Sequence, residues 1–83
     1  MYTIMVVDEQ KRMLNIYKKM IRWEDYNFEI ISFSDSQTQA LSYYKEYKHD
    51  LVILDLKIKT GSGLSLIHEL KAINSDCQII VCS

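Results

Sequence analysis

Residues 51–55 read Leu-Val-Ile-Leu-Asp, and this stretch decides the fold. An unbroken apolar run of this length is typical of a strand buried on both faces of a parallel sheet. Another apolar run, residues 3–7, is followed at once by Asp8 and Glu9. If the two strands lie side by side and point the same way, Asp8, Glu9 and Asp55 meet at one edge of the sheet. Open α/β sheets bind their ligands at this carboxyl edge, so we predict a functional acidic cluster there.

The rest of the chain alternates between helical and strand patterns. Strands are expected at residues 28–33 and 78–83, in addition to 3–7 and 51–54. Helices are expected from apolar positions at helical spacing in three segments: Met13, Leu14, Tyr17, Met20 and Ile21; Ala40, Leu41, Tyr44 and Tyr47; and Leu64, Ile67, Leu70 and Ile73. The order βαβαβαβ predicts an α/β fold with a doubly wound parallel sheet, in one domain of residues 1–83.

Individual residues predict how the second and third helices begin. Ser36 is expected to cap the second helix, and Gln39 stands where a capping box needs it. Gly61 and Gly63 are expected to permit a tight turn into the third helix. They lack the spacing and the Lys-Ser/Thr pair of a phosphate-binding loop, which argues against a nucleotide site.

Composition excludes several classes of protein. The chain has 83 residues and a net charge of −1, which gives no general attraction to nucleic acid or anionic lipid. No apolar stretch approaches the roughly 20 residues of a membrane span. Cys77 and Cys82 are expected to be free thiols in a reducing cytoplasm. His49 and His68 show no metal-ligand spacing and are expected at the surface or at helix ends.

The acidic residues have two interpretations. Asp and Glu after a strand often cap the next helix. Carboxylates crowded at one edge also repel one another, and a divalent cation would relieve that repulsion. The haloacid-dehalogenase class of phosphotransferases uses a strand-end aspartate as nucleophile and needs a second Asp two residues later as acid/base, where this chain has Lys57. A phosphatase-like enzyme is therefore disfavoured, and Asp55 is left as a carboxylate that could accept a phosphoryl group.

Taken in order, these stretches resemble the receiver domain of bacterial two-component response regulators. The matching residues are 4–9 (Ile-Met-Val-Val-Asp-Glu), 34–36 with Ala40-Leu41, 50–56, Gly63-Leu64 and 79–83 (Ile-Ile-Val-Cys-Ser). The resemblance implies a flavodoxin-like sheet with strand order 2-1-3-4. It also implies that a fifth strand and the last two helices of the fold are missing after residue 83.

The resemblance assigns a role to each candidate residue. Asp55 would be the phosphoacceptor, and Ser83 would be the switch hydroxyl that contacts the added phosphoryl group. Asp8, Glu9, Asp55 and the backbone carbonyl of Lys57 would hold Mg²⁺. The chain would not be an enzyme in its own right, although it would assist its own phosphorylation and dephosphorylation.

The same resemblance implies partners for the chain and leaves a second interpretation of its function open. A sensor histidine kinase would donate the phosphoryl group in the cytoplasm, and the output would be transcriptional, with DNA bound only through a segment outside this chain. A homodimer is possible, and no membrane contact is expected. The chain departs from the family at Lys59, where proline is usual, and it lacks the lysine of the fifth strand. The alternative is therefore a pseudo-receiver, a protein-interaction module without phosphoryl chemistry.

We predict that the isolated 1–83 segment is not a stable monomer. Residues 78–83 would form an apolar strand at a sheet edge, and three helices cannot cover four strands evenly. A chain this short has only a few kcal/mol of stability even with a complete core. Sedimentation of the purified segment should show aggregates or a strand-exchanged dimer. A monomer with a cooperative unfolding transition at an ordinary temperature would contradict this prediction.

Overall fold

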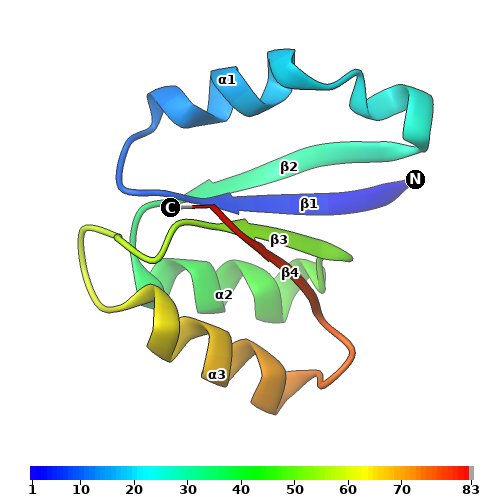
Figure 1. The fold of residues 1–83 in the computed structure, drawn as a ribbon. Helices are drawn as coiled ribbons and strands as arrows, with labels where there is room; N and C mark the ends of the chain where they lie inside the picture. The colour runs from blue at the N-terminus through cyan, green and yellow to red at the C-terminus, as the bar shows by residue number, and fades with distance from the viewer. Residues whose placement is uncertain (83) are drawn as a thin grey trace.

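The computed structural model describes residues 1–82, and every expected strand and helix is present (Figure 1). The elements are β1 (Tyr2–Val7), α1 (Arg12–Met20), β2 (Phe28–Ser34), α2 (Gln37–Tyr47), β3 (Leu51–Leu54), α3 (Gly63–Ile73) and β4 (Gln78–Val81). A short 3-10 helix, η1 (Trp23–Tyr26), lies between α1 and β2.

All neighbouring strands pair in parallel, in the order β2-β1-β3-β4. The predicted α/β class and strand order are therefore confirmed. Figure 1 shows α1 on one face of the sheet and α2 and α3 on the other. Crossovers between parallel strands are right-handed, and the chain crosses the sheet in one direction from β1 to β2 and in the other direction from β2 to β3 and β4. This reversal places α1 on the opposite face from α2 and α3.

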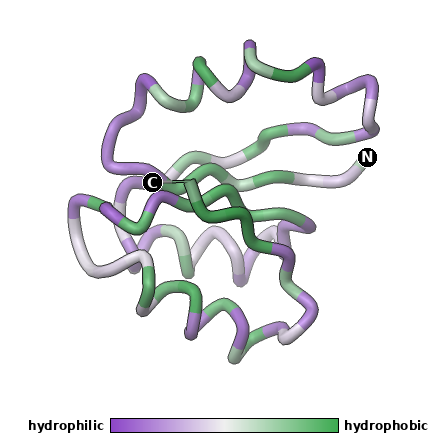
Figure 2. Tube along the Cα trace, in the orientation of Figure 1, coloured by the Kyte–Doolittle hydropathy of each residue, from purple (hydrophilic) through white to green (hydrophobic). Residues whose placement is uncertain are grey.

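The core has two parts, one on each face of the sheet. Met5, Val7, Val52 and Leu54 face α2 and α3, whereas Ile4, Val6 and Ile53 pack with Tyr17 of α1. Neighbouring residues of β1 thus point to opposite faces, and both faces are covered where β1 runs. This explains why the central strands are continuously apolar (Figure 2).

The predicted helix faces are partly wrong. In α1, Tyr17 is buried, but Met20 is 61% exposed and Ile21 lies beyond the helix in extended backbone. In α2, Ala40 and Tyr44 are buried, whereas Tyr47 at the last turn is half exposed.

The predicted face of α3 needs the larger correction. Leu66 and Leu70, one turn apart, are fully buried, whereas Leu64 is 59% and Ile73 is 38% exposed. Apolar residues are frequent enough in α3 that two registers fit a helical period. In the structure Leu66 packs in the core with Leu70, and Ile67 packs against the same core as a partly buried residue.

Helix capping follows the predicted residues with one change. Ser36 Oγ accepts the N–H of Gln39, as a capping box requires. The Gln39 side chain does not return to Ser36, however, because its Oε1 accepts the hydroxyl of buried Ser34 instead. Ser62 caps α3 in the same way, by accepting the N–H of Ser65.

His49, expected at the surface or at a helix end, follows the end of α2 but does not lie at the surface. His49 is only 2% exposed, and its Nε2 lies 2.8 Å from Ser32 Oγ. Its ring packs against Tyr44 and Tyr47. Burial lowers the pKa of His49, so the fold holds the neutral imidazole. His68 is exposed, as expected.

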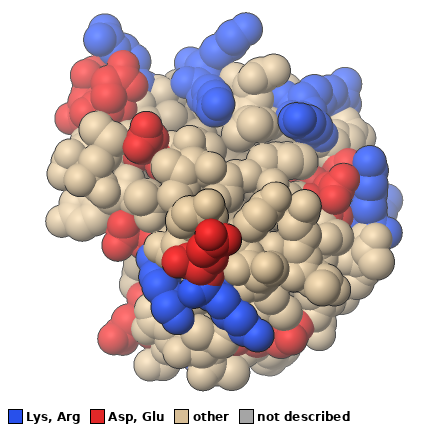
Figure 3. Space-filling view, turned by 180° about the vertical axis from the view of Figure 1, so that it is seen from behind, with Lys and Arg blue, Asp and Glu red and all other residues tan. Residues whose placement is uncertain are grey.

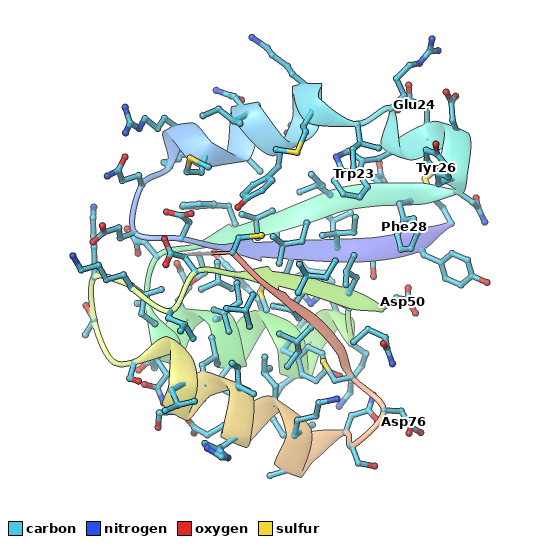
Figure 4. The ribbon with its side chains drawn as sticks, viewed as in Figure 1. Trp23, Glu24, Tyr26, Phe28, Asp50 and Asp76 are labelled. Carbon is cyan, nitrogen blue, oxygen red and sulfur yellow. The ribbon has the colours of Figure 1, made fainter. Side chains whose placement is uncertain are left out.

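Aromatic side chains pack together at the amino ends of β1 and β2. Phe28 lies 5.5 Å from the ring of Tyr2 and 6.3 Å from that of Trp23. Figure 4 shows Trp23 above Phe28, where η1 meets β2, and the indole N–H of Trp23 donates to the carbonyl of Tyr17. The indole thereby ties the connection after α1 back to the helix.

Several apolar side chains on β4 are poorly covered. Ile80 and Val81 are each nearly half exposed, in line with the expected uneven covering of four strands by three helices. Charged side chains are interspersed on the face that Figure 3 shows rather than gathered in one patch. Among residues 1–82, no helix is both long and apolar enough to cross a membrane.

The register of α3 can be tested with two leucines. Leu66→Ala should lower the free energy of unfolding of the intact protein by about 2–5 kcal/mol, because it leaves a cavity in the core. Leu64→Ala, the matched control, should change it by less than about 0.5 kcal/mol. Urea denaturation of both variants measures the difference. Equal costs, or a larger cost at Leu64, would contradict the observed register.

Candidate functional site

Three neighbouring strands end in step at the carboxyl edge of the sheet. Val7 pairs with Leu54, and Leu54 pairs with Val81. The backbone pairing continues one residue further, because Asp55 donates to the carbonyl of Val7 and Cys82 to that of Leu54, both at 2.8 Å. The residues that follow the three strands are therefore held at one edge.

An open pocket of about 370 Å³ lies at this edge. All three predicted carboxylates line it, which places them together as the strand pattern required. The lining residues are Asp8, Glu9, Gln10, Arg12, Met13, Tyr17, Asp55 and Cys82.

Both aspartates are held by local hydrogen bonds. Asp8 Oδ1 accepts the N–H of Gln10 at 3.0 Å, and Asp55 Oδ1 accepts the N–H of Lys57 at 2.9 Å. Within residues 1–82, no protein hydrogen bond reaches the Oδ2 atom of either side chain. Each aspartate therefore keeps an oxygen for a ligand.

The pocket is electrostatically unfavourable for its own carboxylates. Asp8 is only 4% exposed. Its burial raises the pKa of Asp8, and the negative charges of Asp55 and Glu9 raise it further. The hydrogen bond from Gln10 and the charge of Arg12 act in the opposite direction. A cation in the pocket would relieve both the desolvation and the repulsion.

The carboxylate and carbonyl oxygens at this edge are the type of ligand that Mg²⁺ takes. Within the described part of the chain, no three His, Cys, Asp or Glu side chains converge into a ready metal site. Magnesium commonly binds one or two carboxylates and keeps several waters. The free oxygens of Asp8 and Asp55 fit that requirement, and Glu9 lies within the same pocket.

The remaining two predicted site residues are Lys57 and Ser83, and the Lys57 side chain does not line the pocket. Lys57 is exposed, and its N–H holds Asp55. Among residues 1–82, no hydrogen bond reaches the Lys57 carbonyl, so that oxygen is available. Ser83, the predicted switch residue, lies outside the described residues.

Sequence reasoning missed five residues that line the pocket: Gln10, Arg12, Met13, Tyr17 and Cys82. Burial, the side-chain hydrogen bond with Cys82 and the charges of Asp8 and Asp55 raise the pKa of Tyr17 to about 12. Its hydroxyl therefore stays protonated. Helical spacing predicted that Tyr17 is buried, but nothing in the spacing indicated that it borders the acidic pocket. Both cysteines are free, as expected, with Cys77 buried and Cys82 half-buried.

The glycines after β3 act as the sequence predicted. Gly61 has a φ of +91°, a conformation that favours glycine. A Cβ at Gly63 would lie 2.5 Å from the Leu56 backbone, so only glycine allows the start of α3 to approach the loop this closely.

A larger hollow of about 510 Å³ lies elsewhere, lined by Tyr2, Phe28, Asp50, Leu51, Asp76, Gln78, Ile79 and Ile80. Its walls are mostly aromatic and aliphatic. Asp50 is already engaged, because its Oδ2 accepts the N–H of Thr3. We therefore assign the candidate site to the smaller acidic pocket.

Comparison with known proteins identifies the class. The family model described as response regulator receiver domain matches residues 4–83. The chain belongs to this family, the receiver domains of response regulators in two-component systems.

Individual relatives agree with this assignment. The chain is 30% identical over 83 residues to an uncharacterized response regulatory protein of Staphylococcus epidermidis. It is 26% identical to the transcriptional regulatory protein HptR of Staphylococcus aureus. Both alignments include 100% of this chain but only 32% of each relative, so the chain spans about a third of the relatives' length.

A solved structure shows the same fold. The REC domain of AraT, a response regulator from Geobacillus stearothermophilus, superposes with a TM-score of 0.90 at 20% identity. The match covers 96% of this chain and 62% of that structure.

The cost in stability of ionising Asp8 can be measured. The raised pKa means that the folded state favours protonated Asp8, so the ionised form costs stability at pH values above the folded pKa. Asp8→Asn should therefore raise the free energy of unfolding at pH 7 in buffer with EDTA, while its Oδ1 still accepts the Gln10 N–H.

Urea denaturation of the intact protein measures the effect, with exposed Asp76→Asn as the matched control. Asp76→Asn should leave stability unchanged, because Asp76 is exposed and does not line the acidic pocket. A less stable Asp8→Asn variant would show that burial and repulsion do not dominate at this carboxylate.

Proposed function

We propose that Asp55 accepts a phosphoryl group from a phosphohistidine of a sensor kinase. The observation that carries the proposal is the position of Asp55. It directly follows a buried strand and shares a pocket with Asp8 and Glu9, and no hydrogen bond from residues 1–82 reaches its Oδ2. In the transfer, the phosphorus–nitrogen bond of the donor breaks and a carboxylate oxygen of Asp55 bonds to phosphorus.

The chain's own groups support this step. The N–H of Lys57 holds one oxygen of Asp55 and so limits the rotation of the carboxylate. Asp8, Asp55 and the Lys57 carbonyl would hold Mg²⁺, with Glu9 as the further acidic residue. When bound, Mg²⁺ would neutralise the charge on the phosphoryl oxygens.

Phosphorylation would act as a switch rather than as turnover of a substrate. The phosphoryl group carries about two negative charges and replaces the single charge of the Asp55 carboxylate, so an edge that is already acidic gains about one further negative charge. That charge would favour a different arrangement of the edge, and Ser83 is the hydroxyl we expect to respond. The chain would thus be a phosphoacceptor that assists its own phosphorylation and dephosphorylation, and not an enzyme.

The output and its setting are also proposals. HptR is named as a transcriptional regulatory protein, and this chain spans a third of such a relative. We infer that the receiver works in the cytoplasm and controls transcription through a segment outside residues 1–83. A homodimer is one form in which it could bind DNA.

Labelling of the intact regulator with acetyl phosphate and Mg²⁺ tests the proposal. One phosphoryl group should be added, and Asp55→Asn should abolish the labelling because it removes the nucleophilic carboxylate. Asp25→Asn, at an exposed carboxylate beside Arg22, is the matched control and should label normally.

Two outcomes would contradict the proposal. Unchanged labelling of Asp55→Asn would place the phosphoacceptor elsewhere. Failure of the unaltered regulator to label with any donor would favour the pseudo-receiver alternative, a protein-interaction module with the same fold.

A further inference from the structure

The loop that follows Asp55 is fastened to the turn between β2 and α2. Both lie at the carboxyl end of the sheet (Figure 1). The N–H of Lys59 donates to the carbonyl of Asp35 at 2.8 Å, and the N–H of Gln37 donates to the carbonyl of Thr60 at 2.9 Å. Ser36 and Thr60 also form an isolated parallel bridge. Two loops from different parts of the chain thus share backbone hydrogen bonds.

The side chain of Gln37 completes this contact. Its Oε1 accepts the N–H of Ser62 at 2.9 Å, and its Nε2 donates to Glu69 Oε1 on α3. One amide therefore holds both the end of the loop and the helix that follows. We call Gln37, Ser62 and Glu69 the loop clip.

The loop is shaped to fit the clip. A Cβ added at Gly61 would lie 2.4 Å from Gln37 Oε1 and 2.5 Å from Gln37 Cβ. Gly61 thus serves both a left-handed turn and the close approach of Gln37. A side chain at position 61 would push the two loops apart.

Lys59 adds a contact that a proline could not make. Proline is usual at this position in the family and has no N–H, whereas Lys59 uses its N–H to bond Asp35. Its ammonium also lies 3.3 Å from Asp35 Oδ2. The side chain of Lys59 is 64% exposed, so this ion pair contributes little by itself and the backbone bond matters more.

The clip acts on the same loop that surrounds the phosphoacceptor. At the start of the loop, Lys57 N–H bonds Asp55, and the Leu56 carbonyl accepts the N–H of Gly63. In its middle, Ile58 is buried in the core. Gln37 holds the far end of the loop, at Ser62. A displacement of Ser62 would therefore be transmitted to Lys57, because few residues separate the two and Ile58 is anchored in the core.

We propose that Gln37 is a positioning residue for phosphoryl transfer. By holding Ser62 and Glu69, it keeps the N–H and carbonyl of Lys57 in place beside Asp55. This inference rests on the proposed function of Asp55, and it adds a residue that lies outside the acidic pocket.

The test uses the intact regulator. Gln37→Leu keeps the size of the side chain and removes both hydrogen bonds. We expect the rate of labelling by acetyl phosphate and the affinity for Mg²⁺, measured by titration calorimetry, to fall by about tenfold or more. Gln78→Leu, the same substitution on β4 outside the pocket, is the matched control and should leave both unchanged.

A charge-swap pair separates positioning from a loss of stability. Gln37→Glu alone keeps an acceptor for Ser62 but repels Glu69, and it should impair labelling. Combining it with Glu69→Gln restores a donor on α3, so the double variant should regain labelling and Mg²⁺ affinity close to those of the unaltered protein. The pair also decides the question if Gln37→Leu fails to fold.

Each outcome decides one point. If the unaltered regulator is labelled and Gln37→Leu is labelled equally fast, the positioning role is refuted while Asp55 stands. If the double variant is no better than Gln37→Glu, the effect does not act through the clip, and the inference is again refuted. If the unaltered regulator neither labels nor binds Mg²⁺, the proposed function itself fails, and the inference fails with it.

Discussion

The parallel hydrogen-bond register of the three central strands is the constraint on which the site depends. Val7, Leu54 and Val81 lie level with one another across β1, β3 and β4. The pairing runs on into Asp55 and Cys82 through their backbone N–H groups. A slip of one residue in any of these strands would turn its apolar side chains to the wrong face and move its terminal residue away from the pocket. The core and the site are therefore fixed by the same pairing.

The acidic pocket works against the stability that the core provides. Asp8 is buried and faces the charges of Asp55 and Glu9, which makes its ionised form unfavourable. This cost makes the edge sensitive to any added charge, whether from a cation or from a phosphoryl group. The hydrogen bonds from Gln10 and Lys57 keep both aspartates in place despite the repulsion.

The loops at the carboxyl edge support the site from outside the pocket. Gln37 joins the turn after β2 to the loop after β3 and to α3. The same loop carries Lys57 next to Asp55. Its glycines serve this packing, because Gly61 faces Gln37 and Gly63 faces the Leu56 backbone. The geometry around Asp55 thus depends on contacts that belong to another loop.

Short-range patterns determined the class of fold and the position of the acidic edge, whereas the strand order was implied by the resemblance to receiver domains and not by any local pattern. Apolar runs and terminal acids, such as Val7-Asp8 and Leu54-Asp55, are local signals that survive folding unchanged. Only the tertiary structure decided which helical residues are buried, since Leu66 and Leu64 are both apolar and fit a helical period equally well. It likewise buried His49 and brought Tyr17 and Cys82 to the pocket. The physical reason is that packing between elements distant in sequence decides which of several apolar positions on a helix are buried and what they contact, and local periodicity does not specify those partners.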